Sequence, residues 1–383
     1  MNTSTETLSS IEFLICSRCR CRYAFVELQT ISPCCNKPLI ATYSPHGFSR
    51  SVLNSREKSM WRYAEMLPLL DYKNRVTLGE GMTPILKWPT LSAVFGMENL
   101  LVKDEGVNPT GSFKARGIAM AISKAKELGM DSFVIPTAGN AGVALSAYAA
   151  ASETKATVVM PRKTPGYFIE QCEQYGAELI LVDGLIDVCG KTAAELAHTR
   201  GSFNLSTMKE PYRLEGKKTM GYELAEQLNW ELPDVIIYPT GGGTGLIGIW
   251  KAFQEMRSLG WISGKLPRMV AVQSELCCPL LDRFLGRTSK GNNYQMSIAN
   301  GLSVPKAFGE DMIMEVLYES GGSVVTVKEK EIFQSQNEIG SLENMMISAE
   351  GAAAWEAAKK LVQSKQISSD SKILLLNTGR GFK

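Results

Sequence analysis

Residues 234–245 read Asp-Val-Ile-Ile-Tyr-Pro-Thr-Gly-Gly-Gly-Thr-Gly, a short apolar run followed by three consecutive glycines. The run 234–238 predicts a buried strand, and residues 243–257 have the apolar spacing of a helix. Backbone N–H groups of consecutive glycines at the start of a helix bind anions, and the helix dipole strengthens that binding. The stretch lacks both the Gly-x-Gly-x-x-Gly spacing of dinucleotide loops and the Gly-Lys-Ser/Thr of nucleoside-triphosphate loops. It therefore predicts a site for a phosphate monoester.

Short apolar runs alternate with longer helical segments on both sides of this stretch, from Asn99 onward. The alternation is typical of an α/β fold with a mostly parallel sheet whose strands are buried on both faces. Strands are predicted at 100–103, 133–136, 156–160, 178–182, 234–238, 269–272, 324–327 and 373–376. Helices are predicted at 112–128, 141–151, 165–176, 187–200, 219–227, 243–257 and 349–363.

Changes in the pattern divide the chain into three parts. Residues 1–45 are expected to form a small cysteine knuckle, residues 131–206 a small α/β lobe, and residues 46–130 with 207–383 a large α/β lobe. A length of 383 residues and a hydrophobic content of 44% suffice for about two domains. Ligands of such folds bind at the carboxyl ends of the strands, so we expect a cleft between the lobes.

The composition argues against several classes of protein. The 41 basic and 39 acidic residues give a formal charge of +2 without a long charge block, which argues against nucleic acid or a membrane surface as the partner. The first residues do not form a secretory leader, and no apolar run could span a membrane, so we expect a cytoplasmic protein. With two histidines, the chain has little material for a Ser-His-Asp triad. Another group must transfer protons.

Three further stretches carry candidate functional residues. Lys114, in Asn-Pro-Thr-Gly-Ser-Phe-Lys, falls in the first turn of a predicted helix that Ser112 could cap. The helix dipole there favours the neutral amine that imine chemistry requires. Asn140 follows a predicted strand in Ala-Gly-Asn-Ala-Gly, and Thr378 follows the last strand. Each has an ordinary alternative, namely a solvated lysine, a plain strand-to-helix turn and a turn threonine.

Seven stretches in register resemble the fold-type II pyridoxal-phosphate enzymes, and most closely the threonine synthase family. They are Leu-Gly-Glu-Gly-Met-Thr-Pro at 78–84, Asn-Pro-Thr-Gly-Ser-Phe-Lys at 108–114, Ala-Gly-Asn-Ala-Gly at 138–142, Glu-Pro-Tyr-Arg-Leu-Glu-Gly-Lys-Lys-Thr at 210–219, the glycine loop at 240–245, Gly-Leu-Ser-Val-Pro-Lys at 301–306 and Glu-Gly-Ala-Ala at 350–353. The resemblance covers nearly the whole chain. It implies a tryptophan synthase β-like α/β fold with two lobes, bound pyridoxal 5'-phosphate and a homodimer.

The resemblance also implies how the cofactor is held. Lys114 would bind it covalently as a Schiff base and then act as the catalytic base. Asn140 would hydrogen-bond the ring hydroxyl, and Thr378 would face the pyridine nitrogen. The residues that would bind the cofactor phosphate are Gly241, Gly242, Gly243 and Thr244.

For the substrate, the resemblance implies a phosphorylated amino acid. Arg213 would bind its phosphate with two N–H groups of the guanidinium fork. Further candidate substrate contacts are Thr83, Ser112, Thr137 and Asn204. Lys217 and Lys218 are predicted instead to be solvated charges near the start of a helix.

The reaction implied is loss of phosphate from O-phospho-L-homoserine and addition of water, which gives L-threonine. Three departures from the family pattern leave the substrate open: Met82, residues 274–278 and residues 348–350. The alternatives are a β-replacement enzyme similar to cysteate synthase, a serine or threonine dehydratase of the same fold, and a catalytically silent binding protein.

Five cysteines fall within the first 35 residues and suggest a metal site or its remnant. Cys16 and Cys19 match one half of a zinc ribbon, whereas the second half has the adjacent pair Cys34 and Cys35. Tetrahedral zinc needs four ligands, so the candidates are these four, with Cys21 as a possible substitute. A metal-free knuckle is the alternative. The other cysteines, Cys172, Cys189, Cys277 and Cys278, are predicted to be buried thiols.

Overall fold

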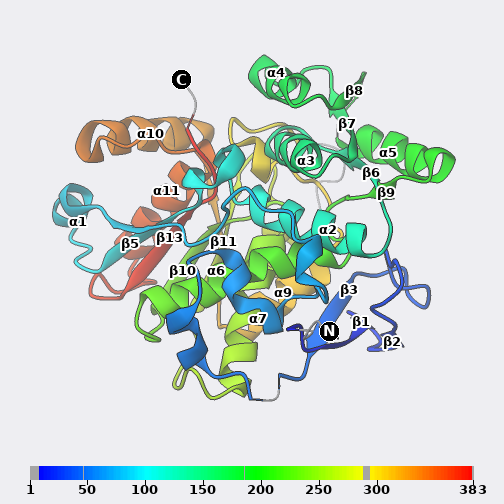
Figure 1. Cartoon of the computed structure of the whole chain (residues 1–383). Coiled ribbons are helices and arrows are strands. Elements are labelled where there is room, and N and C mark those ends of the chain that lie inside the picture. The colour runs from blue at the N-terminus through cyan, green and yellow to red at the C-terminus, as the bar shows by residue number, and fades with distance from the viewer. Residues whose placement is uncertain (1–7, 46, 185, 288–293, 382–383) are drawn as a thin grey trace. The chain divides into compact units, whose positions relative to one another are not determined.

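The computed structural model describes residues 8–45, 47–184, 186–287 and 294–381 (Figure 1). Within these residues the chain forms two compact units. The first comprises the described residues of Met1–Met82 and Lys114–Met220, and the second those of Thr83–Phe113 and Gly221–Lys383. These divisions differ from the boundaries expected at residues 45, 130 and 206, so the lobes named above stay a prediction. No helix in the described part of the chain is both long and apolar enough to cross a membrane.

The first unit contains an antiparallel and a parallel sheet. The antiparallel sheet has the order β2-β1-β3, with β1 (Ile11–Cys16), β2 (Arg22–Tyr23) and β3 (Leu39–Tyr43). The parallel sheet has the order β8-β7-β6-β9, with β6 (Ser132–Pro136), β7 (Lys155–Pro161), β8 (Glu178–Val182) and β9 (Phe203–Asn204). Its helices are α2 (Lys114–Glu127), α3 (Asn140–Ala151), α4 (Gly166–Gln174), α5 (Ile186–Arg200) and the first part of α6 (Tyr212–Gln227). Short 3-10 helices lie at Arg50–Ser55, Met60–Met66 and Tyr72–Asn74.

The second unit is built on a six-stranded sheet of order β12-β11-β10-β13-β5-β4. Its strands are β4 (Ile85–Lys87), β5 (Leu100–Asp104), β10 (Val235–Pro239), β11 (Arg268–Ser274), β12 (Ser323–Val327) and β13 (Ile373–Asn377). All neighbours are parallel except β4, which is antiparallel to β5. The helices are α1 (Pro89–Phe95), the end of α6, α7 (Thr244–Ser258), α8 (Pro279–Phe284), α9 (Glu310–Glu319), α10 (Glu329–Glu343) and α11 (Ala349–Gln363). Short 3-10 helices lie at Glu105–Val107, Pro109–Gly111 and Asn300–Leu302.

The core of the second unit follows from two kinds of sequence. The central strands β10 and β13 are consecutive apolar residues except for Asn377 at the end of β13, and both are buried along their whole length, as parallel strands covered on both faces require. Helix α11 is rich in alanine, a strong helix former, and the Ser348 side chain caps its N-terminus by accepting the Gly351 N–H at 3.1 Å. Its alanines are buried in the same cluster as β13, and α10 lies beside α11 (Figure 1).

The predicted α/β class with mostly parallel sheets is confirmed, whereas three local predictions are wrong. Strand β8 is only half buried because it lies at the edge of its sheet. Helix α6 begins at Tyr212 rather than at residue 219, because the Glu210 carboxylate accepts the N–H groups of Tyr212 and Arg213 at 2.7 and 2.9 Å. Ser112 lies outside the start of α2, which is Lys114, and forms a bridge with Gly379 instead.

Candidate active site

The glycine loop of the second unit follows β10 and opens α7 directly, as the sequence predicts. A Cβ atom on Gly241 would collide with the carbonyl oxygen of Gly301, and one on Gly243 would collide with the Ile313 side chain. Gly243 also has a φ of +75°, which favours glycine. A side chain at either position would therefore require Gly301 or Ile313 to shift.

Thr378 and the residue before Lys114 lie together at the carboxyl end of the same sheet. The backbone N–H of Phe113 donates to the Thr378 carbonyl oxygen at 3.1 Å. The Phe113 ring packs edge-on against Tyr238 of β10, with ring centroids 6.3 Å apart. Phe113 therefore contacts both Thr378 and the end of β10, the strand that precedes the glycine loop. Lys114 is the next residue along the chain.

A buried network fixes the strand end that carries Thr378. Asn377 donates to Asp104 Oδ1 at 2.8 Å, and its side-chain oxygen accepts the Ser348 hydroxyl at 3.1 Å. Burial raises the pKa of the Asp104 carboxyl. Glu350, two residues after Ser348, accepts the Gly301 N–H at 2.8 Å, and Gly301 is the residue that packs against Gly241. The stretch 348–350, which departs from the family pattern, therefore supports both the glycine loop and Thr378.

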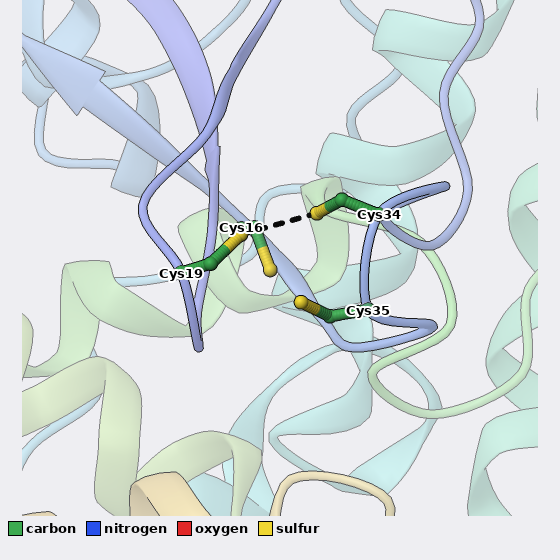
Figure 2. A group of neighbouring side chains, drawn as sticks. All are labelled: Cys16, Cys19, Cys34 and Cys35. Atoms are coloured by element: carbon green, nitrogen blue, oxygen red, sulfur yellow. Dashed lines mark hydrogen bonds between the residues drawn. The ribbon is translucent and has the colours of Figure 1, made fainter.

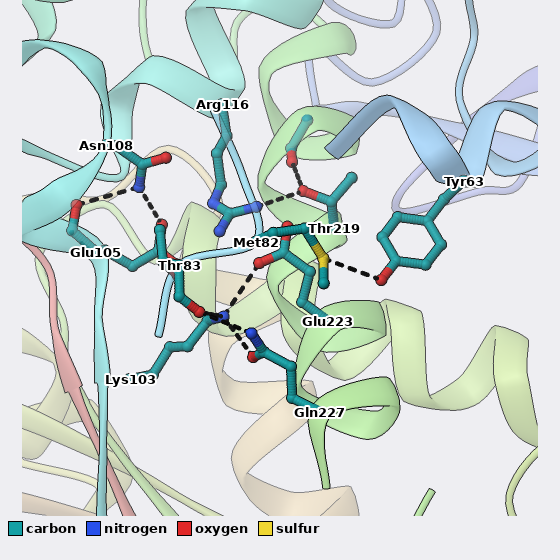
Figure 3. A network of polar contacts seen from close by, with 11 residues as sticks. Tyr63, Met82, Thr83, Lys103, Glu105, Asn108, Arg116, Thr219, Glu223 and Gln227 are labelled. Carbon is teal, nitrogen blue, oxygen red and sulfur yellow. Dashed lines mark hydrogen bonds and ion pairs between the residues drawn. The ribbon is translucent and has the colours of Figure 1, made fainter. Parts of the chain in front are cut away.

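Thr83 belongs to a second network of the second unit (Figure 3). Its hydroxyl donates to Glu105 Oε1 at 2.6 Å, and Asn108 donates to Glu105 Oε2 at 2.7 Å. The Thr83 carbonyl oxygen accepts Lys103 Nζ at 2.6 Å, and that ammonium is also 3.1 Å from Glu223. With its proton donated to Glu105, the Thr83 hydroxyl can offer a substrate only its oxygen as an acceptor.

In the first unit, Asn140 is the first residue of α3, directly after Gly139. Its side-chain Oδ1 is buried and has no hydrogen-bond partner among the described residues. A buried polar atom without a partner is costly, so it indicates a ligand that completes the site. Thr137, three residues earlier, accepts the Gly139 N–H at 3.1 Å, which holds the loop in place.

Arg213 lies in the first turn of α6 and is 1% exposed. Its Nη1 donates to the Leu205 carbonyl oxygen at 2.5 Å, whereas Nε and Nη2 are buried without a partner in the described chain. Burial lowers the pKa of the guanidinium and raises that of the neighbouring Glu210 carboxyl. Asn204 Oδ1 accepts the N–H and hydroxyl of Ser206 at 2.9 and 2.6 Å, which is a local turn contact.

Lys217 and Lys218 are not solvated, contrary to the prediction, since they are 1% and 0% exposed. They lie in the second turn of α6, which starts seven residues earlier than the sequence suggested. Lys218 forms an ion pair with Glu215 at 2.7 Å and lies 3.9 Å from the Tyr43 ring, whose hydroxyl donates to Glu215 at 2.8 Å. The sequence pattern did not predict that the two lysines are buried or that Glu210 caps α6. Pro211 could have indicated the helix start, because proline is common at that position.

The N-terminal cysteines converge as predicted, and Figure 2 shows their side chains gathered together. The Sγ atoms of Cys16, Cys19, Cys34 and Cys35 all lie within 4.8 Å of one another. Cys21 is not part of this group. The remaining cysteines, Cys172, Cys189, Cys277 and Cys278, are buried free thiols, as expected.

Comparison with known proteins agrees with this architecture. Residues 76–379 match the family of pyridoxal-phosphate dependent enzymes. The chain therefore belongs to this family. Among curated relatives, a threonine synthase from Methanocaldococcus jannaschii is 34% identical and covers 88% of this chain and 83% of its own. A threonine synthase from Methanosarcina acetivorans is 31% identical, and the match covers 97% of this chain and 92% of that relative. The resemblance to threonine synthases is thereby confirmed.

Solved structures support the same fold. A pyridoxal 5'-phosphate-dependent aspartate racemase has a TM-score of 0.67 at 23% identity, and covers 79% of this chain and 91% of its own. Maize serine racemase also has a TM-score of 0.67 at 23% identity, with coverage of 79% and 88%. At this level of identity the likeness concerns the fold alone.

Proposed function

We propose that this enzyme is a pyridoxal-phosphate dependent lyase that converts O-phospho-L-homoserine and water into L-threonine and phosphate. The threonine synthase relatives support the reaction. The observation that carries the proposal is the position of Phe113, the residue before Lys114. Phe113 contacts Thr378 and also Tyr238 of β10, the strand that leads into the glycine loop.

The residues fit the cofactor. Asn140 Oδ1 has no hydrogen-bond partner in the described part of the chain, so it can accept the hydroxyl of a pyridine ring. The loop at Gly241–Gly243 carries no side chains, which suits a phosphate ester. We assign covalent attachment to Lys114, the ring hydroxyl to Asn140, the pyridine nitrogen to Thr378, and the phosphate to Gly241, Gly242, Gly243 and Thr244. When bound, the cofactor supplies an electron sink that makes the substrate Cα–H acidic.

This chain's own groups then move the protons. The Lys114 amine removes the Cα proton and, once it has passed that proton on, a Cβ proton, and phosphate leaves from Cγ. The two protons return to Cγ and Cα, while water adds its hydroxyl at Cβ and gives its remaining proton to the phosphate. Arg213 Nε and Nη2, which have no hydrogen-bond partner among the described residues, are suited to bind the leaving phosphate as a fork. We assign supporting substrate contacts to Thr83, Ser112, Thr137 and Asn204.

The test is a panel of amino acids incubated with the purified enzyme. Equal amounts of phosphate and threonine from O-phospho-L-homoserine support the proposal. Phosphate release from O-phosphoserine that requires an added nucleophile such as sulfite would favour the β-replacement alternative. An oxoacid and ammonia from serine or threonine would favour the dehydratase.

Arg213→Ala should raise KM for O-phospho-L-homoserine about 10- to 100-fold, because hydrogen bonds to a charged group contribute about 1.5–3 kcal/mol. Steady-state kinetics measure the change. Lys209→Ala, an exposed cation just before α6, is the matched control and should leave KM unchanged. A dehydratase would tolerate Arg213→Ala, so an unchanged KM would contradict the phosphate role.

We also propose that Cys16, Cys19, Cys34 and Cys35 bind a structural zinc ion. Zn–S bonds of about 2.3 Å place tetrahedral sulfurs about 3.8 Å apart, which suits a group whose sulfurs all lie within 4.8 Å. Elemental analysis should find one zinc per chain, lost in Cys19→Ser and kept in Cys21→Ser. Equal zinc in both variants, or none in the unaltered enzyme purified without chelators, would contradict this site.

The remaining parts of the proposal are a cytoplasmic location and a homodimer, the commonest arrangement of soluble oligomers. Light scattering of the purified enzyme tests the dimer.

A further inference from the structure

Lys217 is a buried lysine to which the proposed function gives no role. It follows Arg213 by four residues on α6, so the two side chains emerge on the same face of the helix. Both are 1% exposed. Taking an ammonium out of water is costly, so a buried lysine is found where neighbouring groups or a ligand stabilise its charge.

Helix α2 brings a third basic group, Lys114, to this place. A Cβ on Gly117 would lie 2.9 Å from both Lys217 Cε and the Arg213 carbonyl oxygen, so α2 packs on α6 at this glycine. Gly117 follows Lys114 by three residues, one turn along the same face of α2. The charges of Arg213 and Lys114, after burial itself, lower the pKa of Lys217 well below its usual value.

Glu210, the carboxyl beside these basic groups, compensates their charge only in part. Glu210 raises the pKa of Lys217, yet burial raises the pKa of Glu210 itself, which favours its neutral form. Glu210 Oε1 and Arg213 Nε and Nη2 are also buried without partners among the residues described. Three basic groups therefore lie near one carboxyl whose neutral form is favoured, and Arg213 Nε and Nη2 lack partners among the described residues. An anion with several oxygens would complete such a site.

We propose that Lys217 is the second cation of the substrate-phosphate site and, with Arg213, selects phosphorylated over unphosphorylated amino acids. The inference rests on the proposed function, which assigns Arg213 to the substrate phosphate. A dianionic phosphate matches two cations better than the single charge of an amino-acid carboxylate does.

The test measures binding of inorganic phosphate to the holoenzyme, in which the cofactor already fills the glycine loop, by titration calorimetry. Lys217→Met, which keeps the length of the side chain, should weaken phosphate binding about 10- to 100-fold, as should Lys217→Gln. Lys209→Met should leave binding within twofold. Thermal unfolding shows whether each variant is folded, and the visible cofactor band shows whether it has bound the cofactor. If Lys217→Met does not fold or does not bind the cofactor, Lys217→Gln takes its place.

Steady-state kinetics of the Lys217 variant complete the test. We expect its KM for O-phospho-L-homoserine to rise by a larger factor than its kcat falls. Phosphate binding that is absent in the unaltered holoenzyme, or unchanged in the folded Lys217 variant, overturns the inference. An equal loss of affinity for unphosphorylated serine overturns it too, because Lys217 would then bind the carboxylate. The proposed function fails separately, if O-phospho-L-homoserine yields no threonine while phosphate binding still depends on Lys217.

Discussion

Replacing Lys114 by alanine should lower kcat by at least about 10³-fold, because the variant loses both the covalent attachment of the cofactor and the base that moves the substrate protons. Lys114 is the first residue of α2, and its neighbour Phe113 is fixed against Thr378. The loss is therefore expected to be chemical, with the fold retained.

Mass spectrometry gives the decisive readout. After borohydride reduction, the unaltered enzyme should carry one cofactor adduct on the peptide that contains Lys114, and Lys114→Ala should carry none. Lys126→Ala, near the other end of α2, is the control and should keep both the adduct and activity. An adduct at a different lysine, or full activity in Lys114→Ala, would refute the assignment.

Gly241→Ala should weaken cofactor binding at least about tenfold and lower the free energy of unfolding by about 1–3 kcal/mol, the usual cost of overpacking. The added Cβ collides with the backbone carbonyl oxygen of Gly301, which the Glu350 contact holds in place. A backbone atom cannot rotate away as a flexible side chain can. Cofactor titration, followed by visible absorbance, and chemical unfolding measure the two effects.

Gly190→Ala in α5 is the matched control, because a Cβ there meets no atom of the described residues within 4 Å. It should stabilise the fold by about 0.5–1 kcal/mol, since alanine is the better residue inside a helix. If Gly241→Ala bound the cofactor as tightly as Gly190→Ala, the loop would have space for side chains and the phosphate assignment would fail.

Most strands of the parallel sheets could be predicted from the sequence, because each is a short apolar run followed by glycine or polar residues. The run that became β13 is one example, and its burial along all five residues agrees with the sequence. The elements that escaped prediction have weaker local signals. Helix α10 starts at Glu329 after an exposed lysine and is amphipathic, and β4 has only three residues.

The start of α6 shows why local patterns fall short. Gly216 and two adjacent lysines suggest a surface segment, since glycine weakens a helix and lysine is rarely buried. In the fold, a Cβ at Gly216 would collide with the Arg116 carbonyl oxygen, so the glycine permits the close crossing of α2 and α6. Arg116 also donates to Thr219 at 3.0 Å across that crossing (Figure 3).

The sequence by itself determined the α/β class, the glycine loop and the family to which the chain belongs. Each of these depends on residues close together in the chain or on a pattern repeated along it. Only the tertiary structure decided that Lys217 and Lys218 are buried and that Phe113 lies against Thr378. It also decided that two Arg213 nitrogens have no hydrogen-bond partner within the described residues. Burial and hydrogen bonding depend on which distant segments pack together, and that information is not present in any local stretch of sequence.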